Sequence, residues 1–271
     1  MLNVYGADFS GAMNPKIFYA HGVLAGSHLT LKSTVECDDR LDLYKAIVRS
    51  VNAIWGLDFP FAIPSSANWK LGFHHRNDML YTVSRMTRKE FAKYVAFELS
   101  NYPRKCVEHD TFYCRHTDIA VHAHSVFKKV NPNLRVMLYA GLKLILYLAE
   151  SRVNVYPFNN LAREEPVYDE SFATVYEVYP SYAWDKVGMK RSLNIDEFIT
   201  RFNDLNLITV ENELDVTELG SQDLADSIVA CVMLAAAYVT QDMKNGWDYR
   251  LPIFTEDEWE WRYIEGLIVR F

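Results

Sequence analysis

The fold is decided by residues 221–238, which read Ser-Gln-Asp-Leu-Ala-Asp-Ser-Ile-Val-Ala-Cys-Val-Met-Leu-Ala-Ala-Ala-Tyr. From Leu224 onward the stretch is apolar on almost every side, so a helix here must be buried in a core. Asp223 and Asp226 stand at its start with the i, i+3 spacing that places two side chains on one helix face. Asp223 suits the positive end of a helix. Asp226 enters the buried run and needs partners or a shifted pKa, so we expect the acidic end of this helix to lie in a site.

Composition limits the class of protein. Of 271 residues, 50% are hydrophobic and 14% aromatic, which suffices for the large core of a single domain carrying an insertion. The most apolar windows, residues 136–149 and 228–239, are shorter than the roughly 20 residues that span a membrane. A basic region followed by an apolar run, typical of a signal peptide, is missing from the N-terminal residues. We therefore predict a cytoplasmic protein without a membrane segment, with its four cysteines reduced.

The net charge of −7 argues against a broad nucleic-acid-binding surface. Lys and Arg do cluster in residues 85–93, 104–105 and 128–135, which leaves room for a local basic channel. If the partner is a nucleic acid, we expect it to be small, single-stranded or structured. The sequence does not specify an oligomeric state.

Three predicted strands end on an acidic residue. Residues 2–8 form a strand that ends on Asp8 before a turn of small residues, residues 53–58 end on Asp58, and residues 173–178 contain Glu177. Residues 17–25 and 28–36 predict a hairpin. Apolar periodicity predicts helices at residues 42–51, 87–101, 134–152, 195–202 and 221–243. This order predicts an α/β fold, a mixed sheet flanked by helices. A long insertion that is partly helical and partly irregular, about residues 66–134, follows the fourth strand.

Six short motifs occur in a recognisable order along the chain. They are Tyr-Gly-Ala-Asp-Phe-Ser-Gly-Ala (5–12), Gly-Leu-Asp-Phe-Pro-Phe (56–61), Tyr-Cys-Arg-His-Thr-Asp (113–118), Tyr-Glu-Val-Tyr-Pro-Ser (176–181), Asp-Leu-Ala-Asp (223–226) and Glu-Gly (265–266). Together they resemble the DUF429 family of predicted ribonuclease H-like nucleases, over about residues 4–266. The resemblance implies a ribonuclease H-like fold, whose enzymes use carboxylates from the first strand, the fourth strand and the last helix.

Five acids are expected to converge at one end of the sheet: Asp8, Asp58, Glu177, Asp223 and Asp226. Clustered carboxylates repel one another and call for bound cations or raised pKa values. Mg²⁺ or Mn²⁺ is the natural partner, and two such ions can stabilise both oxygens of a phosphodiester displacement. We expect a catalytic set of Asp8, Asp58, Glu177 and Asp226, and metal ligation by Asp8, Asp58, Asp223 and Asp226. The alternative is that each acid is structural: Asp58 in a turn, Asp223 as a helix cap, and Glu177 paired with Arg115.

Ser10, Arg115 and Asp118 are the predicted substrate-binding residues. The turn at Ser10 could hold a phosphate with backbone N–H groups, as a related turn does in actin-like kinases. Arg115 suits a phosphate or carboxylate. Its alternative is a structural salt bridge to Glu177 or Asp118.

The insertion suggests two weaker sites. Cys106, His109, Cys114 and His116 have the residue types of a zinc site. Their spacing fits no standard zinc finger, and a histidine-rich loop with buried cysteines is the alternative. His124, with Ser125 beside it, could transfer protons, or it could simply be solvated.

The leading hypothesis from the sequence is a nuclease, a hydrolase that needs Mg²⁺ or Mn²⁺ to cleave phosphodiester bonds. One alternative is an actin-like, ATP-dependent phosphotransferase. Another is a non-catalytic binding domain on the same fold, which would tolerate the loss of Asp8 or even gain stability from it.

Overall fold

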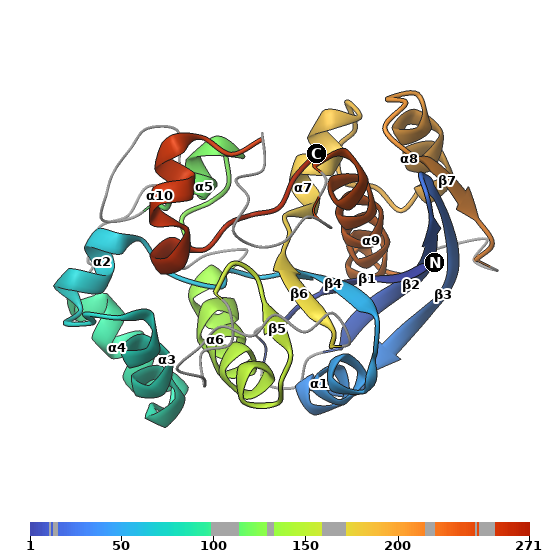
Figure 1. Ribbon diagram of the computed structural model, residues 1–271. Coiled ribbons are helices and arrows are strands. Elements are labelled where there is room, and N and C mark those ends of the chain that lie inside the picture. Colours follow the sequence, from blue (N-terminus) through green and yellow to red (C-terminus); the bar gives the residue numbers. More distant parts are fainter. Residues whose placement is uncertain are drawn as a thin grey trace.

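A computed structural model describes residues 1–10, 12, 16–98, 114–128, 133–158, 172–214, 220–241, 243 and 253–271. Its centre is a seven-stranded sheet in the order β5-β6-β4-β1-β2-β3-β7. Strand β2 is antiparallel to both of its neighbours, and the other pairs in this sheet are parallel. Helices cover both faces (Figure 1). The predicted α/β class, with a mixed sheet flanked by helices, is confirmed.

The strands are β1 (Leu2–Asp8), β2 (Ile17–Ala25), β3 (His28–Cys37), β4 (Ala53–Asp58), β5 (Asn154–Val155), β6 (Thr174–Glu177) and β7 (Thr209–Asn212). The helices are α1 (Arg40–Arg49), α2 (Ser65–Lys70), α3 (Arg76–Arg85), α4 (Arg88–Glu98), α5 (His116–Ala120), α6 (Leu134–Glu150), α7 (Pro180–Lys186), α8 (Ile195–Asn203), α9 (Gln222–Thr240) and α10 (Glu256–Glu265). Each predicted strand and helix is present within a few residues of its expected bounds; residues 99–101 of the predicted 87–101 helix are not described.

The described parts of the insertion contain the predicted helix near residues 87–101 and three further helices that the sequence did not indicate. Helices α2, α3, α4 and α5 lie wholly or almost wholly within it. Helices α3 and α5 begin after His75 and Arg115, whose side chains are not among the usual N-cap types. Their starts therefore lacked the sequence signal that marks a helix. Residues 99–113 and 129–132 of the predicted insertion lie outside the described part of the chain.

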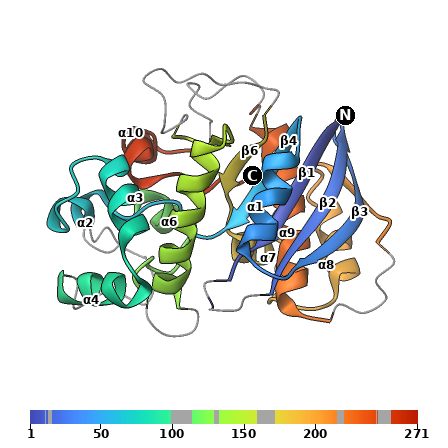
Figure 2. The same cartoon turned by 90° about the horizontal axis from the view of Figure 1, so that it is seen from below.

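Each face of the sheet carries its own apolar core (Figures 1 and 2). On one face α7, α8 and α9 pack over the strands, with Trp184 and Phe198 buried beside α9. On the other face α1 and α6 pack over Trp55 and Phe59, and α3 and α4 lie against α6. The two cores hold the central strands rigidly between them, so the ends of these strands are fixed points for a site.

Helix α9 is the predicted core helix. The Ser221 side chain caps it by accepting a hydrogen bond from the backbone N–H of Leu224, and every residue from Ala225 to Ala237 is buried. By length and composition the helix could cross a membrane, but 72% of that apolar window is buried inside the protein. Helix α9 therefore serves as the core helix of a packed domain. The cytoplasmic location stays a prediction.

Gly6 permits the close approach of α9 to β1. A Cβ atom added at Gly6 would lie 2.1 Å from the backbone nitrogen of Cys231 and 2.4 Å from the backbone oxygen of Ser227. Both are backbone atoms of α9, so the helix itself would have to move away from the sheet. The contact fixes the start of α9 against the strand that ends on Asp8.

We expect Gly6→Ala to lower the free energy of unfolding by about 3 kcal/mol or more, because the clash is with backbone and sidechain repacking cannot relieve it. Gly220→Ala is the matched control, since a Cβ atom there meets nothing within 4 Å. Its effect should stay within about 0.5 kcal/mol. Urea unfolding of the two variants measures both. Equal stabilities would show that α9 does not need this close approach.

Candidate active site

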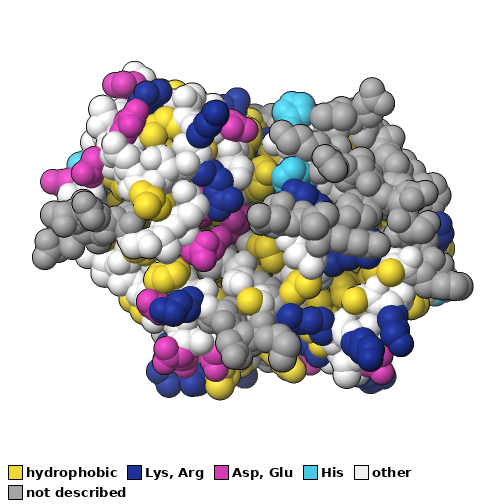
Figure 3. All heavy atoms as spheres, turned by 180° about the vertical axis from the view of Figure 1, so that it is seen from behind, with side chains coloured by type: hydrophobic (Ala, Val, Ile, Leu, Met, Phe, Trp, Pro, Cys, Tyr) yellow, Lys and Arg dark blue, Asp and Glu magenta, His cyan; other side chains and the backbone are white. Residues whose placement is uncertain are grey.

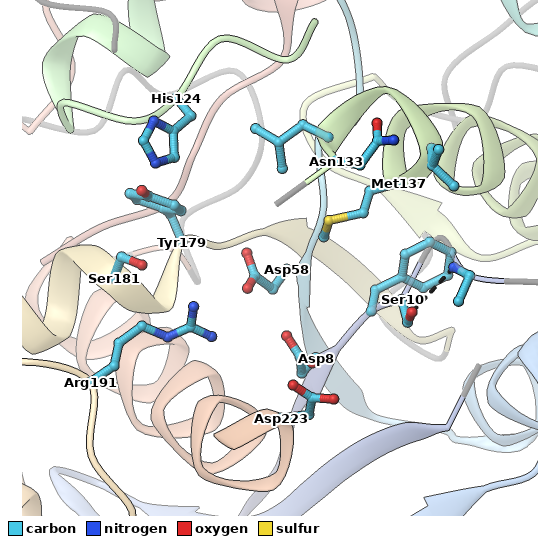
Figure 4. A pocket seen from close by; sticks show the side chains of 14 residues that line it. Asp8, Ser10, Asp58, His124, Asn133, Met137, Tyr179, Ser181, Arg191 and Asp223 are labelled. Atoms are coloured by element: carbon cyan, nitrogen blue, oxygen red, sulfur yellow. Dashed lines mark hydrogen bonds between the residues drawn. The ribbon is translucent and has the colours of Figure 1, made fainter. Parts of the chain in front are cut away.

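A cavity of about 690 Å³ opens at the carboxyl ends of β1 and β4. These strands are parallel, and Asp8 and Asp58 are direct partners in their register, so the two aspartates end adjacent strands. Asp223 lies in the first turn of α9 and lines the same cavity. Figure 4 shows the three carboxylates gathered at the cavity floor. The structure thus brings together three of the five acids predicted to converge.

The carboxyls of Asp8 and Asp58 are strongly perturbed. Burial raises the pKa of Asp8 well above its ordinary value, the charges of Asp58 and Asp223 raise it further, and Arg191 opposes them. Burial likewise raises the pKa of Asp58 to about 7, with Glu177 adding to the effect and Arg191 opposing it. The two carboxyls are hydrogen-bonded to each other. The two carboxyls therefore do not titrate independently, and their titration belongs to the pair.

This pair predicts how stability depends on pH. A carboxyl whose pKa is higher in the folded than in the unfolded protein stabilises the fold below the unfolded pKa and loses that contribution as the pH rises through the folded pKa. Without added divalent cations, the free energy of unfolding should therefore fall by about 1 kcal/mol or more between pH 4 and pH 8. Asp58→Asn should flatten this decline. Urea unfolding across the range measures it, and an identical slope in wild type and variant would refute the assignment.

Arg191 faces the acids from the loop between α7 and α8. Figure 4 shows its guanidinium pointing toward Asp8 and Asp58. The same guanidinium contacts the fully buried carboxylate of Asp226. Asp226 also accepts hydrogen bonds from Trp184 Nε1 at 2.9 Å and Gln222 Nε2 at 3.1 Å. The buried Asp226 carboxylate thus has the partners expected for it. It also holds Arg191 at the cavity. Its predicted roles in catalysis and metal ligation stay predictions.

Glu177 lies in a buried ion-pair cluster behind the acidic cavity. Arg115, only 1% exposed, donates from Nη1 and Nη2 to Glu177 at 2.8 and 2.5 Å, and from Nε and Nη2 to Asp118 at 3.0 and 2.6 Å. Glu177 also accepts from the backbone N–H of Phe61 at 3.0 Å. Arg115 further donates to the backbone oxygen of Glu265 at 3.2 Å. The cluster thus joins α5, β6, the end of α10 and the segment after β4.

In this cluster the two carboxylates stabilise the charged form of Arg115, and Arg115 stabilises the charged form of Glu177. Burial lowers the pKa of Arg115, but Asp118 and Glu177 outweigh it and hold that pKa well above its ordinary value. Burial raises the pKa of Glu177, and Arg115 opposes the rise. Arg115 and Asp118 are buried and bonded to each other, and their predicted role in binding substrate stays a prediction. The structural salt bridge, the alternative for Arg115 and for Glu177, is what the structure contains.

The opposite wall of the cavity carries residues that sequence reasoning did not assign. Besides the acids and Ser10, the cavity is lined by Asn133, Met137, Tyr179, Ser181 and Arg191. Burial raises the pKa of Tyr179 to about 12. The Tyr-Pro-Ser run after the strand of Glu177 was a usable signal for Tyr179 and Ser181. Arg191 had none, because it stands in a loop without periodicity.

Two weaker predictions also fall on this cavity. His124 lines it beside Tyr179, while the neighbouring Ser125 is fully buried, so a proton-transfer role for His124 stays a hypothesis. Ser10 lines the cavity, and its hydroxyl accepts a hydrogen bond from the backbone N–H of Ala12 at 3.2 Å. Gly11 lies outside the described residues, so the predicted phosphate-holding turn stays a prediction.

Metal ligation is not pre-formed in the described ranges: they hold no group of three or more His, Cys, Asp or Glu side chains placed to bind an ion. The expectation of four reduced cysteines is wrong for Cys114, which is disulfide-bonded, whereas Cys37 and Cys231 are free and buried. A disulfide sulfur is not a thiolate ligand, so Cys114 does not serve the suggested zinc site. Cys106 and His109 of that site lie outside the described residues.

Comparison of the chain with protein families, with curated proteins and with solved structures gives no match. The resemblance to the DUF429 family therefore stays a proposal that rests on the six motifs. The function has to be argued from the acidic cavity and its surroundings.

Proposed function

We propose that this chain is a hydrolase that cleaves phosphodiester bonds with the help of Mg²⁺ or Mn²⁺, a nuclease. The observation that carries the proposal is the meeting of Asp8, Asp58 and Asp223 in one cavity, from two adjacent parallel strands and the first turn of a core helix. In open α/β sheets, ligands bind at the carboxyl ends of the strands. Acids brought to that edge by three elements would supply the ligands of a cation once it binds beside a phosphate, because the described residues hold no pre-formed ion site.

The acids suit a divalent cation in charge and donor type. Their raised pKa values express burial and mutual repulsion, which a bound cation relieves. Carboxylate oxygens are the ligands that Mg²⁺ and Mn²⁺ prefer. Asp8, Asp58 and Asp223 would hold the ion. Once bound, a divalent ion polarises a phosphoryl oxygen and lowers the pKa of a coordinated water.

The chain's own residues complete the site around a phosphate. Arg191 points into the cavity and can bind a phosphate oxygen, with Asp226 fixing its position. Tyr179, Ser181 and Asn133 offer further hydrogen bonds along the wall. Phe9 and Met137 give the cavity apolar surface against which a sugar or base can pack. A cavity of about 690 Å³ has room for a short stretch of a nucleic-acid strand.

The finer fold assignment belongs to the same proposal. The run β3-β2-β1-β4-β6, with β2 antiparallel, has the order and directions expected of a ribonuclease H-like sheet. Asp8 and Asp58 end its first and fourth strands, and Asp223 begins α9, the helix predicted as the last of that fold. This agreement supports membership of the DUF429 family, which the six motifs suggested.

The surface favours a compact nucleic acid over long duplexes. Figure 3 shows acidic side chains directly beside Lys and Arg near the middle of one face, with further basic side chains toward its lower edge. Such a mixed surface, at a net charge of −7, neutralises few phosphates. We therefore propose a small, single-stranded or structured nucleic acid as the substrate.

The proposal is tested by titrating Mn²⁺ into the protein by calorimetry and then offering labelled single-stranded DNA, RNA and junctions with and without Mn²⁺. We expect Mn²⁺ binding that Asp223→Asn weakens at least tenfold, and cleavage only with the ion. Asp204→Asn, which removes an exposed acid at the end of α8, is the matched control and should behave as wild type.

The alternatives give different outcomes in the same experiment. Thermal stabilisation by ATP with Mg²⁺ that Asp8→Asn abolishes, without cleavage, would favour the actin-like phosphotransferase. Neither metal binding nor cleavage, with the fold intact, would favour a non-catalytic binding domain and would contradict the nuclease.

A further inference from the structure

A second cavity, of about 220 Å³, lies between α2, the start of α3 and the end of α10. Figure 1 shows α2 and α10 beside each other, away from the sheet. The residues that line it are Asn68, Trp69, Phe73, His74, His75, Arg76, Tyr263 and Ile264. It shares none of these with the acidic cavity, so it is a separate site. Its volume exceeds the roughly 30 Å³ of one water several times over, which is enough for a small organic group.

Arg76 is a buried cation that forms no ion pair with any residue the structure describes. It is 5% exposed, and its Nε and Nη1 have no hydrogen-bond partner within the part of the chain that the structure describes. Its Nη2 donates weakly, at 3.3 Å, to the backbone oxygen of Phe61, and the guanidinium lies 3.2 Å from the centre of the Phe158 ring. Glu177 attracts it, but that carboxylate is already bonded to Arg115. A buried guanidinium without an ion pair is strongly unfavourable, and an anionic ligand in this cavity would remove that cost.

Asn68, which lines the same cavity, is a second buried residue whose polar atoms have no hydrogen-bond partner among the described residues. Its side chain is 4% exposed, and neither its amide oxygen nor its amide nitrogen has a partner among the described residues. An asparagine amide presents an acceptor and a donor side by side. A ligand that satisfies both must offer a donor next to an acceptor, as the edge of a nucleobase does. A simple inorganic anion offers acceptors alone, so it would leave the amide oxygen without a donor.

Aromatic side chains stand at the entrance. The Trp69 side chain is 65% exposed, with its ring centre 5.6 Å from that of His74, and Tyr263 is 40% exposed. An indole so exposed offers a flat apolar face on which a base can stack. Arg76 is also the first residue of the ten-residue helix α3, whose N-terminal end favours negative charge.

We propose that this second cavity binds a nucleotide, with its phosphate on Arg76, its base edge on Asn68 and its base stacked on Trp69. The site stands apart from the acidic cavity and holds whether or not that cavity cleaves phosphodiesters. A nucleotide has a group for each of the three residues: a phosphate for Arg76, a donor next to an acceptor for Asn68, and a flat base for the exposed ring of Trp69.

The test is thermal unfolding with inorganic phosphate, nucleoside monophosphates and the matching nucleosides, at constant ionic strength and without divalent cations. We expect a monophosphate at about 100 times its Kd to raise Tm by roughly 5 °C or more. Phosphate and nucleoside alone should each give less. Arg76→Gln should abolish the shift and, without ligand, leave Tm equal or raised, because it removes an uncompensated buried charge. Trp69→Ala, at an exposed position, should cut the nucleotide shift while sparing the phosphate shift.

Two controls separate the sites and guard against misfolding. Asp8→Asn, in the acidic cavity, should keep the full nucleotide shift, so failure of the nuclease proposal leaves this one standing. Arg270→Gln removes a buried arginine that is paired with Glu258 at 2.6 and 2.8 Å, and it should lower Tm. If Arg76→Gln does not fold, Asn68→Asp repeats the test, since the added charge should weaken monophosphate binding at least tenfold in calorimetry. A nucleotide shift that survives both variants, or no shift in wild type, overturns the proposal.

Discussion

Replacing Asp8 by Asn is expected to reduce kcat for cation-dependent phosphodiester cleavage about 100- to 1000-fold. Asp8 is hydrogen-bonded to Asp58 and close enough to Asp223 to feel its charge, so it stands at the centre of the acidic group. Its removal takes away the charge that would hold the cation and stabilise the developing charge on phosphate. The loss should appear in kcat, because Arg191 and the cavity walls still bind the substrate.

The same substitution should stabilise the protein near neutral pH in the absence of divalent cations. A neutral amide of the same shape removes both the burial cost of the Asp8 carboxyl and its repulsion with Asp58. We expect a gain of about 1 kcal/mol in urea unfolding at pH 7.5, and little gain at pH 4, where the wild-type carboxyl is protonated. Lower activity with higher stability is the signature of a functional acid. Full cleavage by Asp8→Asn would remove Asp8 from the site and with it the nuclease proposal.

Arg115→Met should be the most destabilising single substitution that we predict, by about 3–5 kcal/mol. The change leaves the Asp118 and Glu177 carboxylates facing each other in a buried place, without the guanidinium that bonds to both. It also removes the hydrogen bond to the backbone oxygen of Glu265. Methionine fits the volume, so the loss measures the unpaired charges more than a cavity.

Arg201→Met is the matched control, because Arg201 makes an exposed i, i+4 pair with Glu197 on α8 at 2.7 Å. Such a pair contributes only about 0.3–0.5 kcal/mol. Urea unfolding compares the two variants. A double variant, Arg115→Met with Glu177→Gln, should recover part of the loss, since it removes one stranded charge. Equal, small losses for both arginines would show that the buried cluster adds nothing to stability.

The sheet and its acidic edge could be predicted from the sequence for a simple physical reason. The buried run from Ala225 to Ala237 and the strands before Asp8 and Asp58 are apolar enough to leave few other structures. Parallel neighbours end at the same edge of a sheet, so two acids that end them must meet. At these positions the local apolar pattern favours the same structure as the packing of the whole domain, so the strands and the core helix are predicted correctly.

The rest of the site depends on contacts that no local pattern contains. The sequence predicts Arg115 either as a substrate ligand or as part of a structural salt bridge, and its bond to Glu177 joins residues 62 positions apart. Arg191 reaches the acids from a loop, and Asp226, which holds it, looked like a further metal ligand. The unpaired groups of Asn68 and Arg76 become visible only when their surroundings are known. The sequence shows which side chains are costly to bury, and the structure shows which of these have hydrogen-bond or ion-pair partners.

The cluster around Arg115 also sets an order of events during protein synthesis. Its guanidinium bonds to a backbone oxygen 150 positions further along, and Thr117 accepts a hydrogen bond from the backbone N–H of Ile268, 151 positions further along. Ile268 also forms a parallel bridge beside Glu177. When the last strand of the sheet, β7, has been synthesised, Glu265 and Ile268, which complete this cluster, have therefore not yet been made. The acidic cavity gains the ion-pair cluster behind it only after residue 268 has emerged, so a nascent chain carries the acids before it has the structure that supports them.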